Sequence, residues 1–325
     1  MNSKYRLLLP VCAAALISIS LPENSFAQSS ENGRETATPG SGFIRLTKDG
    51  DQLKALQTAI TRYALTTDQK TIVDLIGAVH IGEGSYYRTL NELFTDYDVV
   101  LYELVAPKGT RVPADGGHRS GNPISFLQTS ARNFLGLESQ LEKVDYSPEN
   151  FRHADLSPAD LKKKMEERGE STLSLAVGAF TELMNDPEMS RKLGSENPKF
   201  GMSELLEMMK NPLKAKQFMA RQMGALGDME DGLGSGLTQL IVDDRNQAAM
   251  KVLDQVLRDG DKKIAIFYGA AHMPDFEERL AARKFERLSQ SWLTAWDLTR
   301  SHATSSGRSD SPMSLLMELM KQMDQ

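Results

Sequence analysis

Cysteine is almost absent from this sequence. The chain of 325 residues contains a single cysteine, Cys12, and it lies within an apolar run near the N-terminus. If that run is removed on export, the mature chain has no thiol at all. The sequence therefore excludes a disulfide framework, a cysteine nucleophile and a zinc site built from cysteines.

Excess positive charge and the common catalytic motifs are also missing. Lysine and arginine number 38 against 44 aspartates and glutamates, which gives a formal net charge of −6, and there is no basic stripe. Nucleic-acid binding is therefore a poor hypothesis.

The sequence has no Gly-x-Ser-x-Gly elbow, no P-loop, no glycine-rich dinucleotide fingerprint and no His-Glu-x-x-His helix. The chain therefore lacks the residues that define serine hydrolases, P-loop NTPases, dehydrogenases and zincins.

No hydrophobic run is long enough to predict a stable membrane span. The apolar run from Leu7 to Leu21 is shorter than the roughly 20 residues that a spanning helix needs. It follows Lys4 and Arg6 and precedes Ser25-Phe26-Ala27, a small-x-small pattern typical of a signal-peptidase site. We therefore expect residues 1–27 to be a signal peptide and the mature protein to be exported, either periplasmic or secreted, with no membrane span after cleavage.

The rest of the chain divides into a linker, one domain and a tail. Residues 28–42 are polar and poor in apolar side chains, so they predict a disordered linker. Residues 43–298 alternate strand and helix patterns and predict one α/β domain, interrupted at about 108–240 by a helical insert. Residues 299–325 predict a flexible tail that carries a short amphipathic helix.

The patterns within the domain predict a mixed central sheet with flanking helices. Segment 71–78 is an apolar strand, and 56–63 is its partner in a hairpin unless it is helical. Helical spacing over 85–95 and a short apolar strand over 98–104 complete a βαβ pattern. After the insert we expect a helix over 243–259, a strand over 262–268, a helix over 274–283 and a last strand near 292–298.

The insert is rich in methionine and poor in strand signals. Nine of the 16 methionines fall between Met165 and Met229, and their spacing follows the helix period. Ser157 and Pro158 predict the start of a helix over 159–168, and no strand is expected between 108 and 240. We interpret the insert as helices packed over the sheet with methionines filling the core. A methionine-rich surface that binds metal or peptide is the alternative.

Two histidines end the same short phrase at two predicted strand ends. His80 closes Gly77-Ala78-Val79-His80 and His272 closes Gly269-Ala270-Ala271-His272, each directly after a buried strand. Glycine lets the backbone turn sharply and approach a ligand closely. Because ligands bind at the carboxyl ends of the strands in open α/β sheets, we expect the two imidazoles to converge there.

Glu103 lies at the carboxyl end of the third predicted strand, just as the two histidines follow the carboxyl ends of theirs. A carboxylate in so apolar a segment must be paired, protonated or bound to a cation, because burying it bare is prohibitive. His80, Glu103 and His272 together would bind one face of a divalent transition metal such as Mn, Fe, Co or Zn. The other coordination positions of the metal would stay open to water and substrate. Two structural histidines and one salt-bridged glutamate are the alternative.

Arg245 and Glu83 are the candidate catalytic residues. Arg245 lies with Asn246 just inside the helix that leads to the second histidine strand. At the positive end of that helix, Arg245 could meet a substrate carboxylate or a developing oxyanion, or it could form a structural ion pair with Glu103 or an aspartate. Glu83, in a glycine-flanked loop three residues after His80, is a candidate general base or further ligand.

The remaining histidines lie outside these phrases. His153 and Asp155 precede the predicted cap at Ser157. We expect them to pin the insert to the sheet, with a role in the site as the alternative. His118 and His302 lie in a loop and in the tail, and we assign them no role.

The motifs resemble those of the TraB/PrgY/GumN family, the bacterial relatives of the Tiki membrane proteases. The resemblance spans residues 43–298 in family order, through VDLIGAVHIGEGSYY with LNELF, VVLYELVAP, NFRHADLSPADL, DDRNQAAM and IAIFYGAAHMPDFEERL. It implies a mixed α/β domain related to the erythromycin-esterase and haem-binding ChaN-like proteins, with His80, Glu103 and His272 at the site and Arg245 beside it. Tiki proteins are Mn- or Co-dependent proteases and pheromone-shutdown members regulate peptide pheromones, so the resemblance implies peptides. A secreted chain and a methionine-rich insert depart from the family pattern.

The sequence thus predicts an exported, metal-dependent hydrolase that cleaves an amide bond in a peptide, with small amides or esters as other possible substrates. His80, Glu103 and His272 would hold a metal such as Mn, Co or Zn, water would be the nucleophile, and Arg245 would steady the oxyanion. Three alternatives stay open. They are a metal-free esterase-like hydrolase with His80 as general base, a protein that binds peptide or haem without turning it over, and an interaction module that works through the insert and tail.

Overall fold

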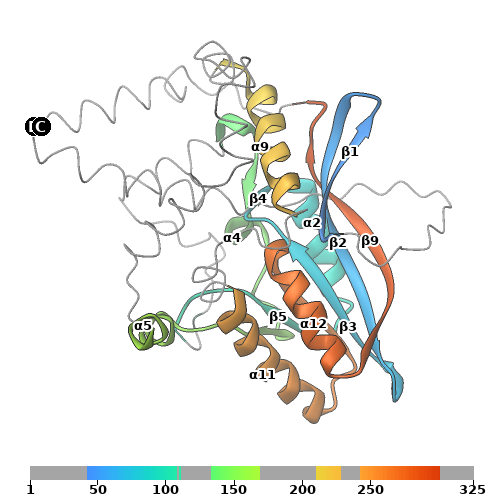
Figure 1. Ribbon diagram of the computed structural model, residues 1–325, viewed down its shortest axis with the longest axis vertical. Coiled ribbons are helices and arrows are strands. Elements are labelled where there is room, and N and C mark those ends of the chain that lie inside the picture. Colours follow the sequence, from blue (N-terminus) through green and yellow to red (C-terminus); the bar gives the residue numbers. More distant parts are fainter. Residues whose placement is uncertain (1–41, 108–109, 111–132, 169–209, 228–241, 301–325) are drawn as a thin grey trace, which may run out of the picture.

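A computed structural model describes residues 42–107, 110, 133–168, 210–227 and 242–300. Figure 1 shows their arrangement. The predicted signal peptide, nearly all of the linker, most of the insert and the tail helix lie outside the described residues. Within the described ranges, no helix combines the length and apolarity needed to cross a membrane.

Seven strands form the main sheet, in the order β1-β2-β3-β8-β5-β7, and β9 also pairs with β2. The pairs that β2 makes with β1, β3 and β9 are antiparallel, whereas β3, β8, β5 and β7 run parallel to one another. The strands are β1 (Ile44–Asp49), β2 (Gln52–Leu65), β3 (Asp68–Ala78), β5 (Val99–Tyr102), β7 (Phe151–His153), β8 (Lys263–Gly269) and β9 (Phe285–Asp297). Two short strands, β4 (Ile81–Gly82) and β6 (Glu138–Ser139), pair separately.

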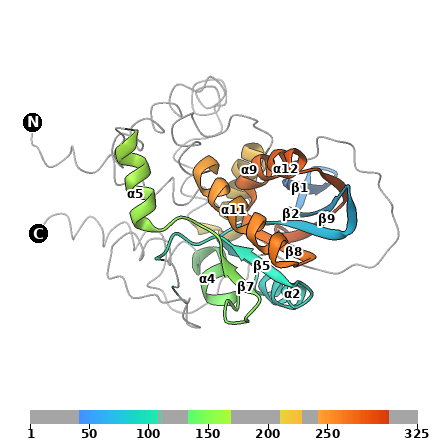
Figure 2. The same ribbon diagram turned by 90° about the horizontal axis from the view of Figure 1, so that it is seen from below.

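Helices cover both faces of this sheet. Figure 2 shows α11 and α12 on one side and α2 and α4 on the other. The described helices are α2 (Gly84–Phe94), α4 (Gln140–Lys143), α5 (Pro158–Glu167), α9 (Pro212–Gly227), α11 (Asp244–Asp259) and α12 (Met273–Ala282), with the 3₁₀ turn η3 (Ala270–His272) between β8 and α12.

The alternation of side chains along β3 creates the two cores. Val73 and Leu75 pack in one buried cluster with apolar residues of α11 and α12, while Ile76 and Ala78 pack in another with the aromatic face of α2. Successive residues of a strand point to opposite faces, so an apolar run of this kind is buried on both sides. The parallel strands are therefore fixed between two helical layers.

Helix α9, which belongs to the predicted insert, lies against β1 and the start of β2 (Figure 1). Ala220 and Met223 are buried in a third cluster with Leu56 and Trp296. Here the methionine fills core space, as expected. The other methionines between Met165 and Met209 lie almost entirely outside the described residues.

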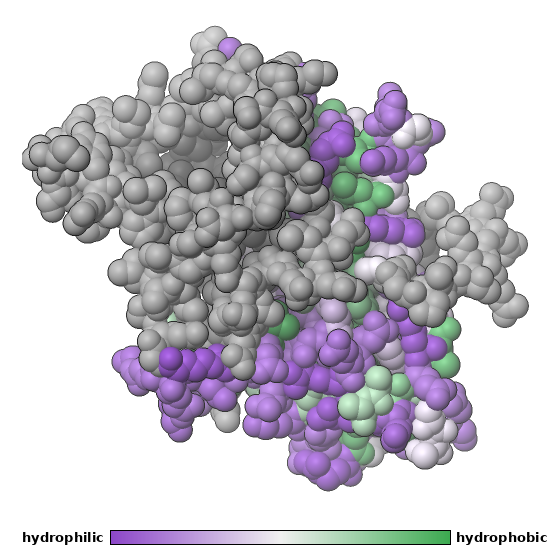
Figure 3. Space-filling model, viewed as in Figure 1, coloured by the Kyte–Doolittle hydropathy of each residue, from purple (hydrophilic) through white to green (hydrophobic). Residues whose placement is uncertain are grey.

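The described surface in the view of Figure 3 is mainly hydrophilic over α5, α11 and α12. Among the described residues, the exposed large hydrophobic side chains are Val105 and Leu288. Single exposed apolar residues are ordinary on protein surfaces.

The predicted fold class, a mixed central sheet with flanking helices, is confirmed. Segment 56–63 is a strand within β2, and the helices and strands expected around the two histidine phrases are present near their predicted bounds. Helix α5 begins after Ser157, whose side chain accepts a hydrogen bond from the Asp160 backbone N–H in a capping box.

The expectation of no strand between 108 and 240 is wrong. β6 and β7 both lie there, and β7 joins the main sheet beside β5. Three residues are too few to show a strand period, and β7 forms because the open edge of β5 supplies backbone partners. β1, which precedes the predicted hairpin, was also not expected.

Candidate functional site

The carboxyl ends of three parallel strands lie side by side and bring the predicted residues to one edge of the sheet. Ala78 of β3 pairs with Gly269 of β8, and Phe267 of β8 pairs with Tyr102 of β5. His80, Glu103 and His272 each follow one of these ends. The convergence expected from the two glycine-histidine phrases thus follows from the strand order.

Glu103 is held by a backbone donor and a cation. Its Oε2 accepts a hydrogen bond from the Gly269 N–H at 2.7 Å, and its Oε1 accepts one from Arg245 Nη2 at 2.7 Å. Its side chain is 9% exposed. Burial raises the pKa of Glu103, but the charge of Arg245, followed by those of His272 and His80 and by the hydrogen bond from Gly269, outweighs it, so the pKa lies well below its usual range. The carboxylate is therefore ionised at neutral pH.

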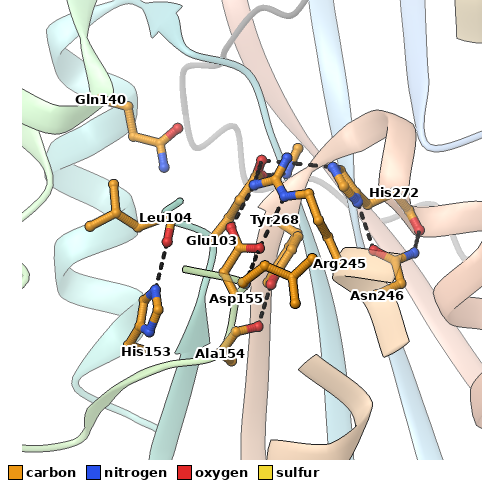
Figure 4. Close-up of polar contacts among 12 residues, drawn as sticks. Glu103, Leu104, Gln140, His153, Ala154, Asp155, Arg245, Asn246, Tyr268 and His272 are labelled. Atoms are coloured by element: carbon orange, nitrogen blue, oxygen red, sulfur yellow. Dashed lines mark hydrogen bonds and ion pairs between the residues drawn. The ribbon is translucent and has the colours of Figure 1, made fainter. Parts of the chain in front are cut away.

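Arg245 joins Glu103 to Asp155 (Figure 4). Its Nε donates to Asp155 Oδ1 at 3.0 Å, and its Nη2 donates to Asp155 Oδ2 at 2.6 Å. Asp155 has a fully buried side chain, so this two-point contact supplies its charge partner. The structural ion pair that the sequence left open is present, and Asp155 belongs to the site. Arg245 Nη1 makes no hydrogen bond to the described residues.

His272 faces Glu103 from η3 and is almost completely buried, with 1% of its side chain exposed. Its Nε2 lies 3.7 Å from Glu103 Oε1, and its Nδ1 lies 2.6 Å from Asn246 Oδ1. Burial lowers the pKa of His272 to about 4, with Glu103 opposing this effect and Arg245 adding to it. The imidazole is therefore neutral at physiological pH.

The four buried groups Glu103, Asp155, Arg245 and His272 together carry an excess of one negative charge. Glu103 and Asp155 supply two carboxylates, Arg245 supplies one guanidinium, and His272 is neutral. One carboxylate charge is left over in a buried setting, where electrostatic interactions are strong. The arrangement therefore favours a cationic partner.

His80 follows β3 and is exposed. Its backbone carbonyl accepts a hydrogen bond from the Gln140 N–H at 3.2 Å. The charge of His80, when present, contributes to lowering the pKa values of both Glu103 and His272. In the part of the chain that the structure describes, no group of three or more His, Cys, Asp or Glu side chains has the arrangement of a metal site. Two of the three predicted ligands, Glu103 and His272, are in contact range of each other.

Glu83 does not join this group. Its Oε1 accepts hydrogen bonds from Lys216 of α9 and from the Asp297 backbone N–H. Lys216 has a fully buried side chain. Among the described residues, the Glu83 carboxylate is the only charge partner found for that lysine. The role of Glu83 as general base or metal ligand stays a prediction.

His153 and Tyr268 support the site from outside. His153 Nε2 lies 2.6 Å from the Leu104 carbonyl, which ties β7 to the chain after β5 as expected. Tyr268 was not singled out by the sequence, because an aromatic residue in a buried strand indicates only packing. Its hydroxyl donates to the Ala154 carbonyl, and its ring contacts His272 edge-on at 5.2 Å.

The fold and site define an α/β protein with a buried cluster of Glu103, Asp155, Arg245 and His272 at the carboxyl edge of its parallel strands. Comparisons of the chain with protein-family models, curated proteins and solved structures find no match.

Proposed function

We propose that this protein is a metal-dependent hydrolase that cleaves an amide bond in a peptide. One observation carries the proposal. The Nε2 of a neutral imidazole and the Oε1 of an ionised carboxylate lie 3.7 Å apart at the edge where α/β sheets bind ligands. Neither atom can donate a hydrogen bond to the other when the proton of His272 is on Nδ1.

The donors fit a divalent transition metal. Ligand atoms about 2.0–2.2 Å from one ion lie roughly 3–4 Å from each other, and imidazole with carboxylate is a common ligand set for such metals. Glu103 and His272 would hold the ion, with His80 from the neighbouring strand end as the third ligand. A bound metal supplies Lewis acidity, which activates water and polarises a carbonyl group.

Arg245 would bind the substrate at the same point. Two of its nitrogens are fixed by Asp155 and Glu103, so the guanidinium cannot swing away. Nη1 is left to donate to the carbonyl oxygen of a scissile amide and to the negative charge that grows there. A donor held in place before the reaction stabilises such an oxyanion without reorganisation.

Family and location belong to the same proposal. Membership in the TraB/PrgY/GumN family rests on the order of the motifs around His80, Glu103, Arg245 and His272. Export to the periplasm or the medium rests on the basic, apolar and small-residue pattern of residues 1–27. Both support a peptide substrate outside the cytoplasm.

The test is peptide cleavage by the mature protein, stripped of metal and then supplied with Mn²⁺, Co²⁺ or Zn²⁺. New termini in a diverse peptide library would be identified by mass spectrometry. We expect cleavage that requires metal and disappears in Glu103→Gln. The control is Glu277→Gln. Glu277, on α12, accepts a hydrogen bond from Tyr63 of β2 and not from any residue of the Glu103–His272 pair, so the variant should leave cleavage intact. No cleavage with any of the three metals would contradict the proposal.

Comparing the metal-free with the metal-supplied protein also distinguishes this proposal from the alternative functions. Hydrolysis that survives metal removal would indicate the metal-free hydrolase, in which an imidazole acts as general base. Recovery of unaltered peptide or haem after tight binding would instead indicate a binding protein.

A further inference from the structure

Asn246 contacts His272 at both ends of its carboxamide. It lies in the first turn of α11 and is fully buried. Its Nδ2 donates to the His272 carbonyl at 3.0 Å, and its Oδ1 lies 2.6 Å from His272 Nδ1 (Figure 4). Nδ2 also donates to Asp275 Oδ2 at 2.6 Å. Every polar atom of the carboxamide therefore has a partner.

These partners allow one orientation of the carboxamide. Both groups at the Nδ2 end, a carbonyl oxygen and a carboxylate, are acceptors, so an inverted carboxamide would set its oxygen against two acceptors. The Asp275 carboxylate is itself fixed by Arg279 Nε at 2.6 Å. Oδ1 must therefore face the imidazole.

The orientation of Asn246 determines where His272 carries its proton. A carbonyl oxygen only accepts hydrogen bonds, so the Nδ1 that faces it must be the protonated nitrogen. A neutral imidazole has one N–H, which leaves Nε2 with its lone pair. The rings of Tyr268 and Phe276 pack against the imidazole and keep that lone pair directed at the side of Glu103.

We propose that Asn246 is a positioning residue that, supported by Asp275, holds His272 in the Nδ1-protonated tautomer and so presents the Nε2 lone pair beside Glu103. The tautomer itself does not depend on the proposed function. Its consequence, a stronger metal site, rests on that function. Residues that orient a metal-bound histidine in this way typically contribute about 10- to 100-fold to metal affinity.

The test is the tautomer of His272 in the full, metal-free chain, read from two-bond nitrogen–proton NMR correlations of the imidazole at neutral pH. We expect the Nδ1-protonated pattern in the natural chain. In Asn246→Ala we expect loss of that single pattern and, in titrations with Mn²⁺ or Zn²⁺, about 10- to 100-fold weaker binding. The matched control is Asn150→Ala. Like Asn246, Asn150 donates two hydrogen bonds through its carboxamide, but both go to backbone carbonyls away from the site. This control should lower stability and leave the tautomer and the affinity unchanged.

A purely structural role for Asn246 predicts a different result. In that case Asn246→Ala would lose stability, yet its folded form would keep the same tautomer and metal affinity, and our inference would be overturned. An Nε2-protonated His272 in the natural chain would overturn it without any variant. The Nδ1-protonated pattern in a chain that binds no metal would uphold the positioning role and count against the proposed function.

Discussion

His272 Nε2 and Glu103 Oε1 lie 3.7 Å apart, although the two residues follow different strands of the sheet. They meet because β8 and β5 are parallel neighbours, so their carboxyl ends emerge at one edge. Arg245 holds the carboxylate from one side and Asn246 holds the imidazole from the other. The pair is thus fixed by two residues from the first turn of a single helix, α11.

Replacing Arg245 by lysine should damage both the stability and the chemistry. Lysine keeps the charge but lacks the planar fork that bonds Asp155 at two points and Glu103 at a third. We expect the free energy of unfolding to fall by about 2–4 kcal/mol, because two buried carboxylates lose donors. If Nη1 is the oxyanion donor, kcat should fall about 10²–10³-fold. Urea unfolding and peptide-cleavage assays measure the two effects.

The matched control is Arg62→Lys. Arg62 makes the same two-point contact with the fully buried Asp74, away from the site. It should lose stability while kcat stays unchanged. Equal kcat values for the two lysine variants would remove Arg245 from the chemistry.

Glu83 should prove to be a structural residue. Glu83→Gln leaves Lys216 charged and fully buried without a carboxylate, and we expect the free energy of unfolding to fall by about 3 kcal/mol. The metal content of the folded protein should not change. The comparison is Glu167→Gln, which removes an exposed helical pair with Lys163 and should cost about 0.5 kcal/mol or less. Loss of metal from folded Glu83→Gln would restore the role predicted from the sequence.

The site residues and Glu83 show which parts of the site a sequence pattern can predict and which it cannot. His80, His272 and Glu103 could be placed at one edge because each ends a buried, apolar strand, and that is a local signal. Glu83 lies in a glycine-flanked loop that gives no sign of Lys216, which comes from a distant helix. The contact is decided by packing of α9 on the sheet, and no local pattern encodes it.

The stability of the metal-free protein should depend on the protonation of His272. Burial lowers its folded-state pKa to about 4, while the unfolded chain titrates at about 6.5. Between these values the unfolded chain binds a proton that the folded chain does not. The free energy of unfolding should therefore decrease as the pH falls from about 6.5 to about 4, by about 3 kcal/mol from this group.

Chemical unfolding at a series of pH values measures this dependence. His272→Gln removes the titrating group, so its free energy of unfolding should change less over the same range. Parallel curves for the natural chain and the variant would show that His272 is not buried in its neutral form.

Tyr268 should contribute to stability through its hydroxyl. In Tyr268→Phe the Ala154 carbonyl loses its buried donor next to Asp155, and the free energy of unfolding should fall by about 1–3 kcal/mol. Tyr63→Phe is the comparison, because its partner Glu277 is partly exposed and water can replace the lost donor. Thermal or urea unfolding should show the larger loss for Tyr268→Phe, and the reverse order would contradict this assignment.

The tertiary partners of the site were less predictable than its strand ends. Asp155 lies beside a helix cap in the sequence, and nothing local selects Arg245 as its partner. β7 is too short to show a period, yet it places Asp155 at the site by pairing with β5. Such contacts arise when strands and helices distant in the sequence pack together, and only the assembled fold reveals them.

Metal content tests the central claim most directly. The mature protein would be isolated under mild conditions and compared, by inductively coupled plasma mass spectrometry, with folded Glu103→Gln/His272→Ala and with His153→Gln as the histidine control. The account predicts about one transition-metal ion per chain in the natural protein and in the control, and little in the double variant. No metal in the natural protein after incubation with Mn²⁺, Co²⁺ and Zn²⁺, or equal metal in all three proteins, would contradict it.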